Sequence, residues 1–175
     1  MSVKRNKGMI VWLTGFSGAG KSTLAQEVAV HLESKQLVRV LDGDDLRKGI
    51  SADLGFSMKD RDENLRRTAE ISRLFAESGF TVITAFISPL QKQRDLARKI
   101  SKDYPFFEVF VDCPLEVCEK RDVKGLYKQA RSGKISEMTG VVSPFEVPIN
   151  PDLHLKTDKL TVEQCVEKIL KLIQG

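Results

Sequence analysis

Short apolar runs alternate along the chain with stretches in which apolar positions recur every three to four residues. The apolar runs have the length and continuity of buried β-strands and lie at residues 10–14, 38–41, 80–87, 106–111 and 153–156. The helical patterns lie between them, at 22–35, 62–78, 89–100, from residue 114 onwards and at 161–173. Parallel strands need crossover connections, so this alternation predicts a three-layer α/β fold: a five-stranded parallel sheet with helices on both faces.

The composition is typical of a folded protein and argues against two classes of partner, nucleic acids and membranes. The 175 residues are 41% hydrophobic and 30% charged, without repeats or linkers, and predict a single domain over 1–175. The net charge of +4 is dispersed and aromatic residues are sparse, which argues against nucleic-acid binding. The apolar runs are shorter than the roughly 18 residues of a membrane span, and no signal peptide is evident. We therefore expect a cytoplasmic protein without a membrane partner.

The turn after the first predicted strand carries the strongest motif. Residues 15–22 read GFSGAGKS, a complete GxxxxGK[ST] between a strand and a helix. Glycines allow such a loop to wrap a phosphate with backbone N–H groups, the lysine reaches the β- and γ-phosphates, and the serine hydroxyl ligates Mg²⁺. The motif predicts an ATP site made by Gly15, Ser17, Gly18, Ala19, Gly20, Lys21, Ser22 and Thr23.

Other classes of P-loop protein fit less well. The guanine-reading NKxD of GTPases is absent, and the only DxxG, at 122–125, follows the wrong strand. An ATPase motor would carry an acid after a core strand, whereas residues 82–87 end in Ser88 and Pro89. A small-molecule kinase is the remaining class.

Acids follow the second predicted strand. Asp42 and Asp44, two residues apart at a strand end, can both project into the cleft, one towards the water shell of Mg²⁺ and one towards an acceptor hydroxyl. The alternative is that acids here cap a helix beginning near Asp45. Further along, Arg61 and Asn64 are three apart on one helical face and can address the same anionic ligand.

Four further motifs, together with the P-loop, resemble the adenylylsulfate kinase family. They are LDGDDLR at 41–47, GFSxxDRxEN at 55–64, FISP at 86–89 and RDVKGLYKQAR at 121–131, and the resemblance runs from about residue 10 to 157. It implies a P-loop NTPase fold with a mobile lid at about 121–145, and usually a homodimer. It also implies transfer of the γ-phosphate of Mg-ATP to the 3′-hydroxyl of adenosine 5′-phosphosulfate (APS), giving PAPS and ADP in sulfate assimilation. The alternatives are another small-molecule P-loop kinase or a non-catalytic nucleotide-binding module.

The resemblance also implies roles for individual residues. Asp44 orients the 3′-hydroxyl and accepts its proton, and Asp42 lies near the metal, which it reaches through water. Arg47, Arg61 and Asn64 hold the phosphosulfate and ribose, and Phe56 clamps the adenine of APS. Ile87 and Ser88 contact the substrate; Ser88 has been described as a phosphoserine intermediate in some members, but in-line transfer needs no enzyme nucleophile.

The lid segment brings further predictions. Arg121, Lys124, Lys128 and Arg131 recur at spacings of three and four, which indicates a cationic stripe on one helical face; a solvated helix face is the alternative. The resemblance implies that Arg121 contacts ATP and that APS is contacted by Lys124, Leu126, Met138 and Thr139. Two positions depart from the family: Asp45 replaces a frequent Asn, and Met138 replaces the usual Phe of the adenine clamp.

Overall fold

The fold is a three-layer α/β arrangement in the computed structural model, which describes residues 8–135 and 138–175. The described strands form one parallel sheet in the order β2-β3-β1-β4-β5 and have the bounds β1 (Met9–Thr14), β2 (Val38–Asp42), β3 (Thr81–Ala85), β4 (Phe106–Asp112) and β5 (Leu153–Lys156). The predicted parallel sheet is therefore confirmed, including its fifth strand.

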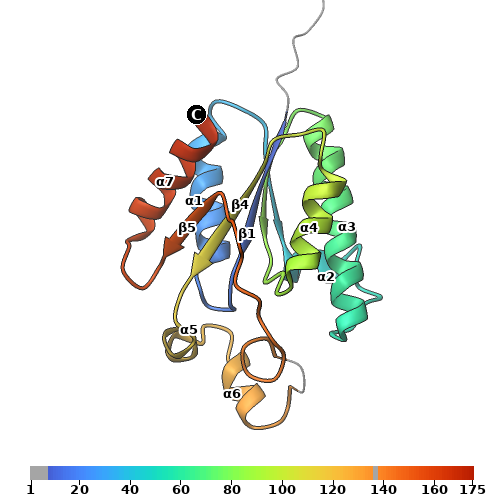
Figure 1. Cartoon of the computed structure of the whole chain (residues 1–175), viewed down its shortest axis with the longest axis vertical. Coiled ribbons are helices and arrows are strands. Elements are labelled where there is room, and N and C mark those ends of the chain that lie inside the picture. Colours follow the sequence, from blue (N-terminus) through green and yellow to red (C-terminus); the bar gives the residue numbers. More distant parts are fainter. Residues whose placement is uncertain (1–7, 136–137) are drawn as a thin grey trace, which may run out of the picture.

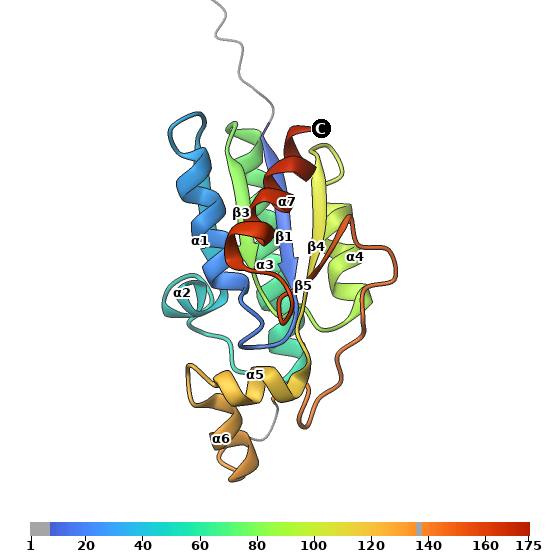
Figure 2. The ribbon, with the colours of Figure 1, turned by 90° about the vertical axis from the view of Figure 1, so that its left-hand side faces the viewer.

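The helices lie on both faces of this sheet and beyond one end of it. Their bounds are α1 (Lys21–Leu32), α2 (Gly43–Lys48), α3 (Met58–Glu77), α4 (Gln91–Ile100), α5 (Leu115–Arg121), α6 (Leu126–Arg131) and α7 (Val162–Gln174). Helices α1 and α7 pack on one face, and α3 and α4 pack on the other (Figure 1). Figure 2 shows α5 and α6 beyond the carboxyl ends of the strands, where ligands bind in parallel sheets.

Each face of the sheet has its own apolar core. Alternate residues of β1 point to opposite sides: Val11 and Leu13 pack with α1 and α7, whereas Ile10 and Trp12 pack with α3. The Trp12 ring stacks between two phenylalanines, Phe86 at 6.1 Å and Phe106 at 5.9 Å between ring centroids. Burial on both faces explains why the strands read as continuous apolar runs.

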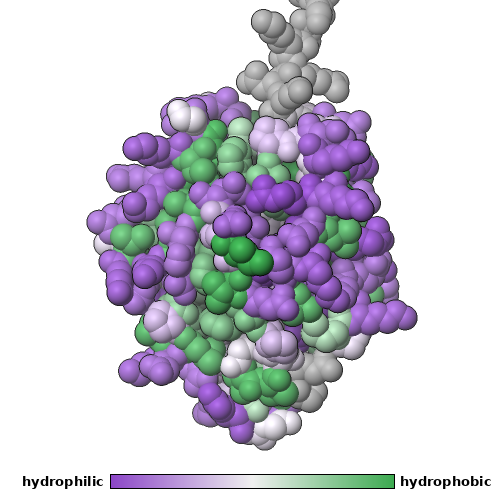
Figure 3. All heavy atoms as spheres, viewed as in Figure 1, coloured by the Kyte–Doolittle hydropathy of each residue, from purple (hydrophilic) through white to green (hydrophobic). Residues whose placement is uncertain are grey.

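The surface differs between the flanks and the centre. In Figure 3, hydrophilic side chains cover much of the flanks, and apolar side chains gather in the centre and lower part. The segment between α6 and β5 runs down this part of the molecule in Figure 1, and its Val142, Val147 and Ile149 are exposed. None of the helices within residues 8–135 and 138–175 is long and apolar enough to span a bilayer.

Several element boundaries differ from the sequence prediction, including the following three. Helix α3 begins at Met58 instead of residue 62, because the Ser57 hydroxyl accepts a hydrogen bond from the Asp60 N–H (3.2 Å) and caps an earlier turn. Strand β3 ends at Ala85 instead of residue 87, since the chain then turns through Ser88 at φ 37°. Helix α4 begins at Gln91, two residues after Pro89.

The prediction of a cationic stripe on one helical face was wrong. Helix α5 ends at Arg121, the chain turns through Asp122 (φ 25°), and α6 begins only at Leu126. The Asp122 carboxylate accepts hydrogen bonds from the N–H groups of Tyr127 and Lys128, both at 3.0 Å, and so stabilises the start of α6. The four cations, Arg121, Lys124, Lys128 and Arg131, are therefore distributed over two short helices and the turn between them.

Candidate active site

A cleft of about 940 Å³ opens where the strands end. It is lined by the P-loop and the start of α1, by the turns after β2 and β3, by the motif at 55–64 and by the α5–α6 segment. Every residue predicted for the site lines this cleft except Gly15. Gly15 lies behind it, at φ 149°, where a Cβ would come within 2.2 Å of the Val111 carbonyl oxygen, so only glycine fits.

Lys21 is enclosed by the P-loop itself. Its ammonium donates hydrogen bonds to the carbonyl oxygens of Gly15 (2.9 Å) and Phe16 (2.7 Å), and the residue is only 8% exposed. Burial lowers the pKa of Lys21 to about 8, although the nearby Cys118, Asp42 and Asp44 act in the opposite direction. The lysine is therefore a desolvated cation that an anionic phosphate would stabilise.

Ser22 and Asp42 bring a hydroxyl and a carboxylate together. The Ser22 hydroxyl donates to Asp42 Oδ2 at 2.6 Å, and Asp42 Oδ1 accepts the Asp44 N–H at 2.9 Å, which makes Asp42 the N-cap of α2. The alternative prediction that acids here cap a helix is therefore confirmed for Asp42, but the helix begins at Gly43 and not near Asp45, which pairs with Lys48 on the surface. Oxygen donors of this kind are the ligands that Mg²⁺ prefers.

Asp44 projects from the first turn of α2 into the cleft. Its carboxylate forms an ion pair with Lys124, which lies in the turn between α5 and α6. The second predicted acid therefore lies opposite the lid segment, whereas Asp42 lies against the P-loop.

Two arginines fix the loop before α3. Arg47 donates to the Gly55 carbonyl oxygen at 2.7 Å, and its guanidinium lies 4.3 Å from the centroid of the Phe56 ring. Arg61 donates through Nε to the Phe56 carbonyl oxygen and through Nη1 to Thr139 Oγ1, both at 2.7 Å. The Phe56 ring itself remains exposed, with 63% of the residue accessible.

Asn64 lies below these arginines and lines the same cleft. The residue is buried, yet its Oδ1 atom has no hydrogen-bond partner among the described residues. A buried amide oxygen without a partner is destabilising, so a ligand that donates or reorients this amide would be favoured here.

Residues of α5 and α6 form hydrogen bonds with the P-loop. Arg121 donates to the carbonyl oxygens of Gly18 (3.3 Å) and Thr157 (3.0 Å), and the Tyr127 hydroxyl donates to the Ser17 carbonyl oxygen (2.8 Å). Thr157 in turn donates through its hydroxyl to the Ala19 carbonyl oxygen at 2.8 Å. Thr157 was not predicted from the sequence, although its place directly after a predicted strand was a usable signal.

Met138 and Thr139, which follow α6, line the cleft together with Leu126. Met138 is 7% exposed and packs partly into the core. Met138 therefore lines the cleft and also contacts the apolar core, whereas Phe56 is exposed.

The turn after β3 holds Ser88 in a strained conformation. Its φ of 37° is in the left-handed region, which for a residue other than glycine costs about 1–3 kcal/mol. The Ser88 hydroxyl accepts a hydrogen bond from the Trp12 indole at 3.1 Å, and its carbonyl oxygen accepts one from Arg94 at 2.7 Å. Ile87 precedes it in the cleft wall, and its carbonyl oxygen accepts from the Thr14 hydroxyl at 2.7 Å.

Comparison with known proteins shows the family of this chain. The family described as adenylylsulphate kinase matches residues 7–156. The adenylyl-sulfate kinase of Clostridium kluyveri is 52% identical over 168 residues, which is 95% of this chain and 83% of that protein. A probable adenylyl-sulfate kinase of Halalkalibacterium halodurans is 54% identical over 169 residues, 95% of this chain and 84% of its own length.

A solved structure agrees with these relatives. The APS kinase CysC of Mycobacterium tuberculosis, in complex with AMPPNP and APS, superposes with a TM-score of 0.93 at 46% sequence identity. The match covers 97% of this chain and 99% of that one. On the family match, the relatives and this structure, the chain belongs to the adenylylsulfate kinase family.

Proposed function

We propose that the protein transfers the γ-phosphate of ATP to the 3′-hydroxyl of APS, giving PAPS and ADP. The observation that carries the proposal is the composition of one cleft: the P-loop and the motif at 55–64 line the same cavity, and so do two carboxylates, Asp42 at the end of β2 and Asp44 in the first turn of α2. The family of the chain supports the same reaction.

On the ATP side, the P-loop N–H groups and Lys21 hold the β- and γ-phosphates. The buried ammonium leaves its two carbonyl partners for the more strongly charged phosphate oxygens, an exchange that desolvation favours. Ser22 and Asp42 would hold Mg²⁺, Asp42 through water, and their oxygens, 2.6 Å apart, suit such a site. When bound, Mg²⁺ neutralises charge that develops on the transferred group.

On the acceptor side, Asp44 orients the 3′-hydroxyl and accepts its proton. Because phosphoryl transfer goes through a loose transition state, the main task of the acceptor site is alignment. Arg47, Arg61 and Asn64 hold the anionic phosphosulfate and the ribose, as charge-assisted hydrogen bonds do efficiently. The exposed Phe56 ring stacks on one side of the adenine, with Met138 on the other side.

Transfer is direct and does not pass through Ser88. The Ser88 hydroxyl is buried and is the acceptor for the Trp12 indole, so phosphorylation would break that hydrogen bond and add a charged group to the interior. In-line attack by the substrate hydroxyl needs no such intermediate. Ser88 contributes to the shape of the acceptor site.

The test is ADP release by the purified protein with Mg-ATP, with and without APS, combined with chromatographic identification of the product. We expect release that depends on APS and a product phosphorylated at the 3′ position. Two controls accompany the assay. AMP, which keeps the 3′-hydroxyl but lacks the sulfate, is the control acceptor, and the Lys21→Met variant is the control protein. Faster turnover of a sugar acid or nucleoside would favour another small-molecule kinase, and nucleotide binding without transfer would favour a non-catalytic module.

The assembly and location of the protein are proposed from the resemblance alone. We propose a homodimer that acts in the cytoplasm. Sedimentation equilibrium of the purified chain tests the dimer, because a monomer at micromolar concentration would contradict it.

A further inference from the structure

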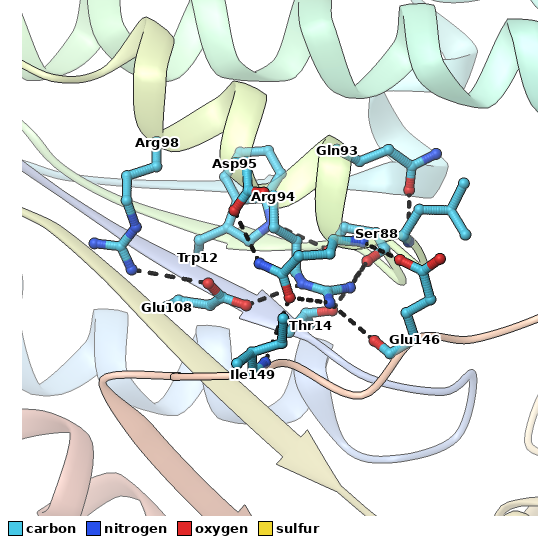
Figure 4. A network of polar contacts seen from close by, with 12 residues as sticks. Trp12, Thr14, Ser88, Gln93, Arg94, Asp95, Arg98, Glu108, Glu146 and Ile149 are labelled. Atoms are coloured by element: carbon cyan, nitrogen blue, oxygen red, sulfur yellow. Dashed lines mark hydrogen bonds and ion pairs between the residues drawn. The ribbon is translucent and has the colours of Figure 1, made fainter.

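A fully buried arginine connects the turn after β3, which lines the cleft, with the segment that runs from Thr139 to β5 (Figure 4). Arg94, on α4, has an exposed fraction of 0%, and its Nε lies 3.0 Å from the Glu108 carboxylate of β4. One terminal nitrogen, Nη1, donates to the Ser88 carbonyl oxygen at 2.7 Å. The other, Nη2, donates to Gln91 Oε1 at 2.9 Å and to the Glu146 carbonyl oxygen at 2.8 Å.

The geometry of this contact goes beyond charge neutralisation. A buried cation needs a counter-ion, and Glu108 supplies it on one edge of the guanidinium. Besides the Gln91 side chain, the terminal N–H groups bind the backbone carbonyl oxygens of Ser88 and Glu146, which are 58 residues apart in sequence. Only a planar group with several fixed donors can make these contacts at once, so the network requires arginine specifically.

One of these two segments lines the cleft, and the other follows directly on residues that line it. Ser88 is the strained residue of the turn after β3 and lines the acceptor side. Glu146 lies on the segment that returns from Met138 and Thr139 to β5. This return segment is joined to the same turn a second time, since the Glu146 N–H donates to the Pro89 carbonyl oxygen at 2.7 Å.

The neighbouring aromatic ring extends the connection to the P-loop. Phe145, directly before Glu146, packs its ring 4.8 Å from Phe16 and 6.0 Å from Phe110, measured between centroids. The Arg94 guanidinium lies 5.9 Å from the centroid of the Phe145 ring. Arg94 thus fixes both the backbone and the side chain at the carboxyl end of the lid segment.

We propose that Arg94 is a positioning residue for the acceptor: it fixes the Ser88 turn against the return segment at 145–149, so that Ser88 keeps its place in the wall of the APS site. This inference rests on the proposed function. Misplacing a reacting group by about 1 Å can lower the rate of transfer by about 10²-fold. A residue that does not touch the substrate can therefore have a large effect on the rate.

The direct test is Arg94→Lys, with Arg98→Lys as matched control. A lysine at 94 keeps a cation beside Glu108 but cannot reach all three oxygens at once. Arg98 lies one turn further along α4 and pairs with the same Glu108 at 3.8 Å, but its hydrogen bonds go to the Phe106 carbonyl oxygen and Asp152. The two variants therefore disturb the same carboxylate and differ in their effect on the cleft.

For Arg94→Lys we expect kcat/KM for APS to fall by at least about tenfold while the Kd for ATP changes by less than about twofold. For Arg98→Lys we expect both quantities to stay within about twofold of wild type. A wild-type kcat/KM in Arg94→Lys, an equal loss in Arg98→Lys, or an equal loss of ATP affinity would each overturn the proposal, because a merely structural role affects both substrates.

Hydrogen exchange of the ligand-free protein tests the anchoring without the reaction. Amides at 145–149 should exchange faster in Arg94→Lys and at the wild-type rate in Arg98→Lys; no difference between them contradicts the proposal. If Arg94→Lys does not fold, Arg94→Met combined with Glu108→Gln removes both buried charges and should show the same selective loss for APS. Failure of the proposed function would give a different result, because the wild-type protein would then not phosphorylate APS. In that case the hydrogen-exchange comparison alone would test whether Arg94 anchors the return segment.

Discussion

Binding of ATP should be accompanied by uptake of a proton at Lys21. Burial lowers the pKa of this lysine to about 8 in the free protein, and a bound triphosphate will raise it because the phosphate charges stabilise the ammonium. At about pH 8.5 Lys21 is only about a quarter protonated, so binding should take up about three quarters of a proton per nucleotide. Since only the charged form binds well, ATP affinity should fall about tenfold from about pH 7 to about pH 9.

Titration calorimetry measures this uptake. Mg-ATP is titrated without APS at about pH 8.5, above the second pKa of phosphate at about 6, in two buffers of different ionisation enthalpy. The slope of the observed enthalpy against the ionisation enthalpy of the buffer gives the number of protons taken up.

Lys21→Met should abolish the slope, whereas Lys124→Gln should retain most of it, because burial is the largest cause of the low pKa of Lys21 and the charge of Lys124 contributes less. A slope near zero in the wild-type protein, or an equal slope in Lys21→Met, would refute the assignment. The same shift predicts that the unliganded protein becomes more stable as the pH rises from about 8 to 10.5, because the unfolded chain binds more protons in that window.

Three further substitutions test other residues of the cleft. Asp44→Asn should lower kcat by about 10²- to 10⁴-fold with little change in ATP affinity in steady-state kinetics; near-normal kcat would exclude the base role. Ser88→Ala leaves the Trp12 indole without its acceptor and should lower the free energy of unfolding by about 1–3 kcal/mol in denaturant titrations. That variant should still transfer phosphate, whereas inactivity with a phosphoserine in the wild type would contradict direct transfer. Met138→Phe should tighten APS binding by up to about tenfold, non-additively with Phe56→Ala; additive effects in equilibrium titrations would place Met138 away from the adenine.

The strands could be predicted from the sequence because each is buried on both faces. The first turn of α3 could not, because residues 58–61 are polar or exposed and carry no apolar periodicity. Its signal was local instead: Ser57 caps the helix and Asp60 follows three residues later. Helix boundaries of this kind depend on backbone capping, which hydrophobic patterns do not report.

The break between α5 and α6 shows a second limit. Spacings of three and four are equally compatible with one long helix or two short ones, so the four cations suggested a single face. Asp122 and Gly125 carried the missing information, since a short acid and a glycine can both take up left-handed turns. Chain breakers outweigh side-chain periodicity when the two disagree.

The positions of the site residues could be predicted from motifs, but their connections could not. Asp42 was predicted to lie near a metal ion, yet the role of its side chain as the N-cap of α2 became visible only in the fold. That cap matters for the proposed chemistry, because it fixes Asp44 relative to Ser22 through one carboxylate. Substitution of Asp42 would therefore disturb the metal site and the acceptor base together.

The burial of Arg94 could be predicted from the sequence only in part. The helix that carries it is highly charged, and nothing in its pattern separates Arg94 from the half-exposed Arg98. The informative residue is Glu108, a single carboxylate inside the apolar run at 106–111. A charge in the middle of a buried parallel strand requires a cation nearby, so the strand predicts a buried partner. Which arginine fills that place depends on the turn after β3 and on the return segment at 145–149, because their carbonyl oxygens satisfy the remaining donors of Arg94 and not those of Arg98.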